Sequence, residues 1–211
     1  MRKDKKVKEL IPTNDRVIRT ALRAILKDNF EENNQSNKHH LKIFEEFGVG
    51  HGIARIDMAV INGIMHGYEI KSDRDTLKRL SDQMNEYNAV FDKVTLVVGK
   101  SHLYNAINII PDWWGIMIAK IVKNKKIAFN TIREADYNPE QKGVSIARLL
   151  WREEALKILE EKNKAVGFHS KPRSLIYEEL ANVLDEETLK NKVKNILLIS
   201  REDWRSDVQL M

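Results

Sequence analysis

The chain has 211 residues, of which 42% are hydrophobic and 32% are charged, a balance typical of a folded globular protein. Its net charge of +5, from 36 Lys and Arg against 31 Asp and Glu, leans weakly toward polyanionic partners. The absence of cysteine excludes disulfides and thiolate metal sites, and suits a reducing cytoplasm. No apolar run approaches the roughly 20 residues that a membrane span needs, so we expect no membrane partner.

The spacing of apolar residues predicts an α/β protein with a mixed sheet flanked by helices. The expected elements are a helix over 15–30 capped by Asn14 or Asp15; strands over 41–47, 55–61 and 64–71; a helix from 72 or 73 to about 90; a buried strand over 94–98; a hairpin of strands over 116–122 and 126–132; and helices over 144–163, 174–184 and 188–199, the last capped by Asp185. The pattern becomes entirely helical near residue 137. We therefore expect a core over 1–137 and a small helical C-terminal subdomain over 138–211.

Two acids and a lysine at one point form a minimal site for cutting a phosphodiester bond, because the acids hold a divalent cation and the lysine orients the attacking water. The pattern Asp/Glu-x-Lys occurs four times, at Asp4–Lys6, Glu69–Lys71, Glu140–Lys142 and Glu160–Lys162. Only the copy at Glu69 falls in a predicted strand, where alternate residues share one face. This copy is the candidate site.

Asp57 lies on the preceding predicted strand and joins Glu69 only if the loop between the strands has an odd number of residues. A three-residue loop over 61–63, ending in a left-handed glycine, pairs Asp57 with Gly67 and places Glu69 on the diagonal. Gly67 would then leave room for a metal and water. A two-residue turn would put Asp57 on the opposite face, and a further alternative is a set of solvated charges in which Lys71 forms a simple ion pair.

Asp57, Glu69-Ile70-Lys71 and Gln83-x-x-x-Tyr87 together resemble the PD-(D/E)XK nuclease superfamily, in particular its RecB-like members. Across residues 15–120 the chain looks like a bacterial and phage-borne branch of that superfamily. The resemblance implies a restriction-endonuclease-like core that uses Mg²⁺ or Mn²⁺.

The resemblance also assigns roles to single residues. It implies Glu46, Asp57, Glu69 and the backbone carbonyl of Ile70 as metal ligands, Lys71 as the residue that positions the water, and Gln83 and Tyr87 as further catalytic residues facing the site from the next helix. Glu45 is the alternative to Glu46 as the metal-binding acid that precedes Asp57 in the sequence, and strand alternation does not decide between the two. The proline that the superfamily carries before its first acid is Ile56 here.

We therefore expect a metal-dependent deoxyribonuclease, an endonuclease acting on double-stranded or branched DNA. One alternative is a nuclease-fold module that binds DNA or protein without turnover. A second is a transcriptional regulator that works through the C-terminal helices. The sequence leaves open the choice between DNA and RNA, the biological pathway and the oligomeric state, a homodimer included.

Overall fold

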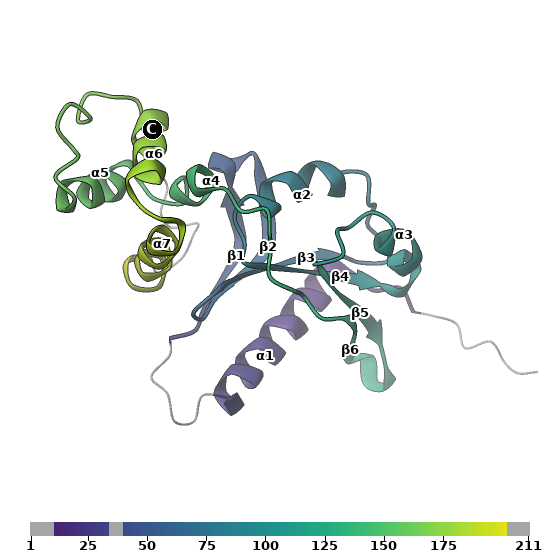
Figure 1. The fold of residues 1–211 in the computed structure, drawn as a ribbon. Helices are drawn as coiled ribbons and strands as arrows, with labels where there is room; N and C mark the ends of the chain where they lie inside the picture. Colours follow the sequence, from purple (N-terminus) through teal and green to yellow (C-terminus); the bar gives the residue numbers. More distant parts are fainter. Residues whose placement is uncertain (1–10, 34–39, 202–211) are drawn as a thin grey trace, which may run out of the picture.

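A six-stranded mixed sheet forms the centre of the computed structural model, which describes residues 11–33 and 40–201 (Figure 1). The strands lie side by side in chain order: β1 Lys42–Val49, β2 Ala54–Ile61, β3 Met65–Lys71, β4 Lys93–Gly99, β5 Gly115–Ile121 and β6 Ile127–Arg133. β4 runs parallel to β3 and to β5, whereas the other neighbouring pairs are antiparallel. The expected α/β architecture, a mixed sheet flanked by helices with a helical C-terminal segment, is confirmed.

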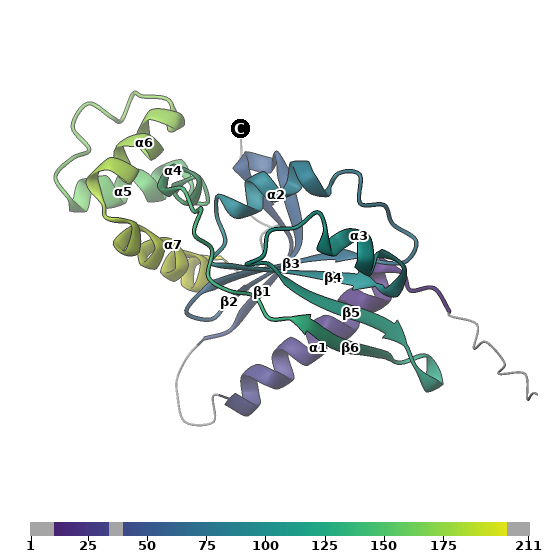
Figure 2. The same ribbon diagram turned by 45° about the vertical axis from the view of Figure 1, so that its right-hand side comes forward.

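Helices cover both faces of this sheet (Figure 2). α1 lies on one face and α2 and α3 lie on the other, while the remaining helices gather beyond β1 (Figures 1 and 2). Their bounds are α1 Asp15–Asn33, α2 Leu80–Asn88, α3 Leu103–Ile107, α4 Gly143–Ala147, α5 Arg152–Glu161, α6 Arg173–Val183 and α7 Glu186–Ser200. Within the described ranges, none of these helices combines the length and the apolar character that a bilayer crossing requires.

Two of the expected helix caps are present. The Oδ1 atom of Asn14 accepts a hydrogen bond from the backbone N–H of Val17 at 3.1 Å, so Asn14 rather than Asp15 caps α1. Asp185 accepts in the same way from the N–H of Thr188, at 2.8 Å, and caps α7.

The sheet is buried on both faces. Residue alternation along 55–61 and 64–71 predicts instead a polar face that carries Asp57, Ala59, Met65 and Glu69, and this prediction is wrong for most of the face. On the α1 side, Ile18 and Leu22 pack against β2 and β3. On the other side, Ala59 and Met65, which the sequence assigned to the polar face, are fully buried with the residues of α2. The face is polar only where β2 and β3 approach the candidate site, because α2 covers the remainder.

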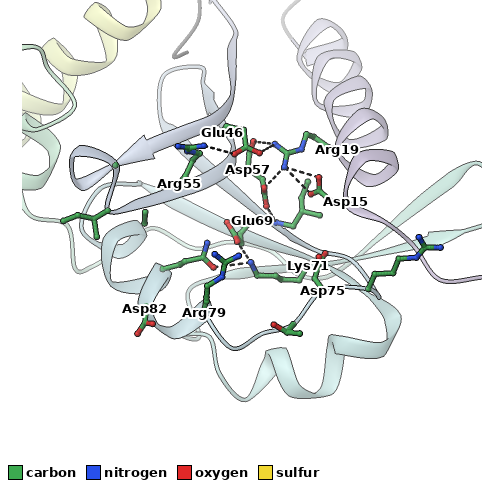
Figure 3. Close-up of a pocket in the computed structure, with 17 residues that line it drawn as sticks. Asp15, Arg19, Glu46, Arg55, Asp57, Glu69, Lys71, Asp75, Arg79 and Asp82 are labelled. Carbon is green, nitrogen blue, oxygen red and sulfur yellow. Dashed lines mark hydrogen bonds and ion pairs between the residues drawn. The ribbon is translucent and has the colours of Figure 1, made fainter. Parts of the chain in front are cut away.

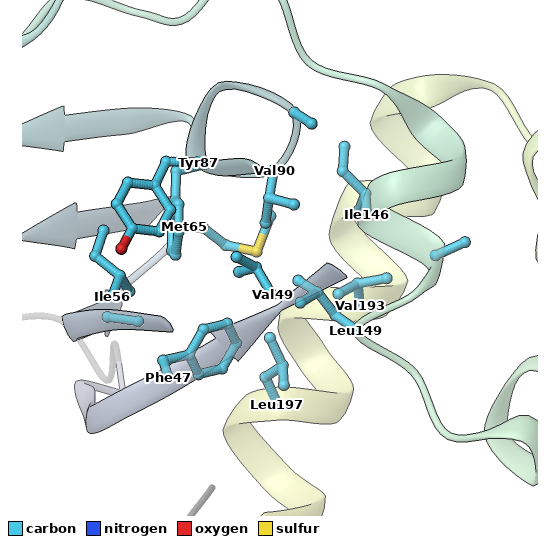
Figure 4. Packing of buried hydrophobic residues seen from close by; sticks show 14 of the residues in the cluster. Phe47, Val49, Ile56, Met65, Tyr87, Val90, Ile146, Leu149, Val193 and Leu197 are labelled. Atoms are coloured by element: carbon cyan, nitrogen blue, oxygen red, sulfur yellow. The ribbon is translucent and has the colours of Figure 1, made fainter. Parts of the chain in front are cut away.

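The C-terminal helices share a core with the sheet (Figure 4). Ile146 and Leu149 from the α4 region, and Val193 and Leu197 of α7, belong to the same hydrophobic cluster as Val49 of β1. The connecting segment also contacts the core, because the N–H of Lys142 donates to the carbonyl of Ala89 at 3.0 Å. Removing these helices would therefore expose apolar surface of the sheet domain.

Two of the expected helices differ from those in the structure. Residues 72–79 form turns rather than the start of a helix, because the N–H and hydroxyl of Ser72 both donate to Asp75, at 2.7 and 2.6 Å, and close a local turn. The helix expected over 144–163 is divided into α4 and α5, and the carboxylate of Glu154 accepts from the N–H of Trp151 at 2.7 Å where α5 begins. The apolar spacing did not predict α3, which is only five residues long.

The loop between β2 and β3 has three residues, as expected, but they are 62–64 rather than 61–63. Gly63 has φ +100°, and Ile61 pairs with Met65. Ile61 is fully buried, which favours keeping it in the strand and placing the half-buried Ile64 in the loop. The shift sets Gly67 opposite Ala59, so the expected pairing of Gly67 with Asp57 is wrong.

Gly67 faces the hydrophobic core rather than a metal or water. A Cβ atom at this position would lie 2.5 Å from Cδ1 of Ile56 and 3.1 Å from Cδ2 of Phe91. The close approach of these two side chains, and not space for a ligand, accounts for the glycine.

Gly67→Ala is expected to lower the free energy of unfolding by about 1–3 kcal/mol, because the added methyl group must displace packed core side chains. Urea denaturation measures this change. Gly143→Ala is the matched control, since its Cβ would lie 3.4 Å from that of Ala181 and fits without displacement; its effect should be below about 1 kcal/mol. Equal stability of the two variants would contradict the packing described for Gly67.

Candidate active site

A cavity of about 870 Å³ opens where α1, β1, β2, β3 and α2 approach one another (Figure 3). Its lining includes Asp57 from β2, and Glu69, Ile70 and Lys71 from β3. The structure therefore brings the three residues of the sequence-derived site into one cavity. Of the other Asp/Glu-x-Lys copies, those at 140–142 and 160–162 do not line it, and Asp4–Lys6 lies outside the described residues.

Asp57 lies where the backbone pairing of β2 with β3 stops. That pairing runs from Ile61–Met65 to Met58–Tyr68. Beyond it, the carboxylate of Asp57 links the strands, because Oδ2 accepts a hydrogen bond from the backbone N–H of Ile70 at 2.7 Å. The side chain is thereby fixed against β3, next to the residues that complete the site.

Glu69 and Lys71 lie two residues apart on β3 and point to the same side. They are 2% and 8% exposed, and the Nζ atom of Lys71 lies 2.5 Å from Oε1 of Glu69. The same Nζ donates to Oε1 of Gln83 at 3.2 Å. Two opposite charges buried this deeply must be paired and hydrogen-bonded, and both conditions hold here.

Gln83 and Tyr87 lie one turn apart on α2 and both reach this pair. Nε2 of Gln83 donates to the Tyr87 hydroxyl at 3.0 Å. That hydroxyl lies 2.9 Å from Oε2 of Glu69 and 2.6 Å from the carbonyl oxygen of Arg55, and its single proton serves one acceptor at a time. Burial and the charge of Glu69 raise the pKa of Tyr87, so its hydroxyl remains a donor. Lys71, Gln83, Tyr87 and Glu69 thus form a closed ring of contacts.

The structure separates the two candidate upstream acids. Glu46 lines the cavity, and its Oε1 lies 2.8 Å from Nη1 of Arg19. Glu45 is not part of the lining and forms an ion pair with Arg23 instead. Strand alternation could not decide between them because Glu46 has φ +53°, which interrupts the regular strand geometry on which alternation depends.

The two central carboxyl groups hold protons more tightly than they would in water. Burial, together with the charge of Glu69, raises the pKa of Asp57 to about 7. Burial also raises the pKa of Glu69, although the nearby Lys71 opposes the shift. The two acids are therefore close and poorly solvated, an arrangement that an added cation would stabilise.

The donor atoms suit a hard divalent cation. Carboxylate and carbonyl oxygens are the ligands that Mg²⁺ and Mn²⁺ prefer, and Mg²⁺ is commonly held by one or two carboxylates with water and phosphate completing its shell. Asp57 and Glu69 supply the carboxylates, and Ile70, whose N–H bonds to Asp57, also lines the cavity. Across 11–33 and 40–201 no group of three or more His, Cys, Asp or Glu side chains is arranged to hold a metal ion. A site built on two carboxylates would leave the remaining ligand positions to water and substrate.

Arg19 and Asp15 of α1 also line the cavity, although the sequence does not predict them as site residues. Nη2 of Arg19 lies 2.6 Å from Oδ1 of Asp57 and 3.2 Å from Asp15. The only available signal was the four-residue spacing of Asp15 and Arg19 on one helix face, which is common on solvated helices. Nothing in the sequence connected that pair to Asp57, 38 residues further along the chain.

The fold and the cavity define an α/β protein with buried, paired acids and a lysine at one site. A family model described as bacteriophage P4 protein cII matches residues 12–207, and the chain belongs to this family. Protein cII of Enterobacteria phage P4 is 44% identical over 55 residues, which cover 26% of this chain and 21% of that protein, so the match spans about a fifth of that relative's length.

Among solved structures, the SPO1766 protein of unknown function from Silicibacter pomeroyi is similar to this chain with a TM-score of 0.39 and 16% identity. The similarity covers 74% of this chain and 93% of that one. A score this low carries no argument about function, and the chemistry has to be inferred from the site itself.

In metal-free solution, wild-type stability relative to Asp57→Asn is expected to fall as the pH rises from about 4 to 7. The pKa of Asp57 is about 7 in the folded protein and near 3.8 in the unfolded chain, so the folded state binds more protons throughout this window. The stabilisation by protonated Asp57 is complete below the unfolded-state pKa. It is lost as the pH rises to the folded-state pKa, and the free energy of unfolding then falls by up to about 1.4 kcal/mol per pH unit. Urea denaturation of both proteins with a chelator present measures it; a pH-independent difference would contradict the described environment.

Proposed function

We propose that the protein is a metal-dependent deoxyribonuclease, an endonuclease that hydrolyses phosphodiester bonds in this cavity. The observation that carries the proposal is the convergence of Asp57, Glu69 and Lys71: Glu69 and Lys71 are buried, which is costly for charged groups, and the side chain of Asp57 is only 18% exposed. Charges retained at such a cost in a cavity are a feature of functional sites. The intact set of two acids and a lysine favours turnover over a purely binding role.

Each residue has a role in this chemistry. Asp57, Glu69 and the carbonyl of Ile70, with Glu46 as a further ligand, would hold Mg²⁺ or Mn²⁺, which when bound lowers the pKa of the attacking water and offsets charge on the phosphate. Lys71, fixed by Glu69 and Gln83, presents its ammonium group to the water and the phosphate. Tyr87 holds the second oxygen of Glu69. The carboxylate is thus oriented before substrate arrives, which lowers the cost of assembling the site.

The rim of the cavity supports DNA as the partner. Arg55, Arg74 and Arg79 line it and are exposed; the side chain of Arg55 is 61% accessible. Guanidinium groups bind phosphate oxygens through paired hydrogen bonds without reading the sequence. Asp75 and Asp82 also line the cavity and are exposed, so the rim is mixed in charge, and the three arginines are the groups in it that would contact a nucleic-acid backbone. We place this activity in the cytoplasm, consistent with the absence of cysteine.

Asp57→Ala and Lys71→Ala are each expected to reduce Mg²⁺- or Mn²⁺-dependent cleavage of DNA to below about one hundredth of the wild-type rate, because each removes a group required at the reacting phosphate. Supercoiled, linear and branched DNA serve as substrates, with a chelator as the blank. Circular dichroism checks that the variants fold. Glu178→Ala, which removes an exposed acid on α6, is the control and should cleave like the wild type.

The same assay addresses the alternatives in the intact chain, which avoids deleting helices that share its core. Cleavage retained by pure Asp57→Ala or Lys71→Ala protein would overturn the mechanism. DNA binding by the wild type, with no cleavage under any metal condition, would instead indicate a binding module.

A further inference from the structure

Arg19 contacts three carboxylates at the cavity, those of Asp15, Glu46 and Asp57 (Figure 3). Its Nη2 lies 2.6 Å from Oδ1 of Asp57, and its Nη1 lies 2.8 Å from Oε1 of Glu46 and 3.1 Å from the backbone carbonyl of Asp57. Asp15, one helical turn earlier, lies 3.2 Å from the same Nη2. The side chain is only 14% exposed, so this is an enclosed contact rather than a surface ion pair.

The position of Arg19 follows from the packing of α1. Ile18 and Leu22 are fully buried against the sheet and fix the rotation of the helix about its axis. Arg19, next to Ile18, is thereby directed toward the cavity instead of bulk solvent. Because a guanidinium is charged at any pH at which proteins fold, α1 delivers a permanent positive charge to the acids.

The guanidinium of Arg19 is bonded to the carboxylate oxygen of Asp57 that a divalent cation would need. Oδ2 of Asp57 is bonded to the N–H of Ile70, and Oδ1 is bonded to Arg19. Glu46, the upstream acid of the site, is also held by Arg19. A cation approaching Asp57 from the cavity must therefore share Oδ1 with the guanidinium or replace it.

We propose that Arg19 is a positioning residue of this site, a resident cation that holds Asp57 and Glu46 together and is displaced from Asp57 when a divalent cation binds. The inference rests on the proposed metal-dependent function. Asp15, which is 41% exposed and on the same helix, gives the displaced guanidinium a second carboxylate near solvent. Phosphate oxygens entering the cavity would offer it another anion, so metal and nucleic acid would assist each other's binding.

The test is Mn²⁺ binding by calorimetry in the absence of DNA, which does not depend on turnover. Arg19→Ala is expected to bind Mn²⁺ about tenfold or more tightly than the wild type, because the competing cation is gone. Arg23→Ala is the matched control: it removes the same charge from the next turn of α1, where the partner is Glu45, and should bind like the wild type. Arg19→Gln, which keeps a hydrogen-bonding side chain without the charge, should follow Arg19→Ala and serves if the alanine variant does not fold.

Unchanged or weaker Mn²⁺ binding by folded Arg19→Ala or Arg19→Gln would overturn the inference. Asp57→Ala separates that result from failure of the proposed function. If Asp57→Ala loses Mn²⁺ while the Arg19 variants match the wild type, the metal site stands and only the role of Arg19 is wrong. If Asp57→Ala binds Mn²⁺ as tightly as the wild type, the proposed metal site is wrong, and the role of Arg19 falls with it.

Discussion

The hydrogen bond from the backbone N–H of Ile70 to the carboxylate of Asp57 holds β2 and β3 together where their backbone pairing ends and the cavity begins. In an ordinary ladder a backbone carbonyl would accept such a bond, but here the side chain does so after the Met58–Tyr68 pair. Because the Asp57 side chain takes the place of a backbone carbonyl, the two strands separate here without leaving the N–H of Ile70 unpaired. It also brings an acid of β2 next to Glu69 of β3, and the cavity between α1 and α2 depends on this arrangement.

A site with two neighbouring carboxylates requires rigid packing around it, because poorly solvated like charges repel one another and destabilise the fold that contains them. The rigidity comes from the two cores. On one face Ile18 and Leu22 fix α1, and on the other Tyr87 is fully buried and fixes α2. Lys71 from the sheet and Arg19 from α1 then reach the acids from different sides. The packing that stabilises the sheet therefore also sets the distances within the site.

Sequence periodicity was sufficient for the strands of the sheet, and it placed Asp57 near the Glu69–Lys71 pair although the polar face and the register assumed for that grouping were wrong. It failed where tertiary packing selects between locally similar choices. Burial of Ile61 rather than Ile64 moved the hairpin loop by one residue, and no local pattern distinguishes these two isoleucines. Arg19 was missed because its partner Asp57 lies 38 residues away and on another element.

The proposed function requires that Asp57 and Glu69 hold a divalent cation. Anomalous X-ray scattering from crystals of the wild-type protein grown with Mn²⁺ locates such an ion directly. We expect a manganese peak in the cavity, at about 2.1 Å from carboxylate oxygens of both residues. Crystals in which manganese at saturating concentration binds elsewhere, or leaves these two carboxylates uncoordinated, would contradict it.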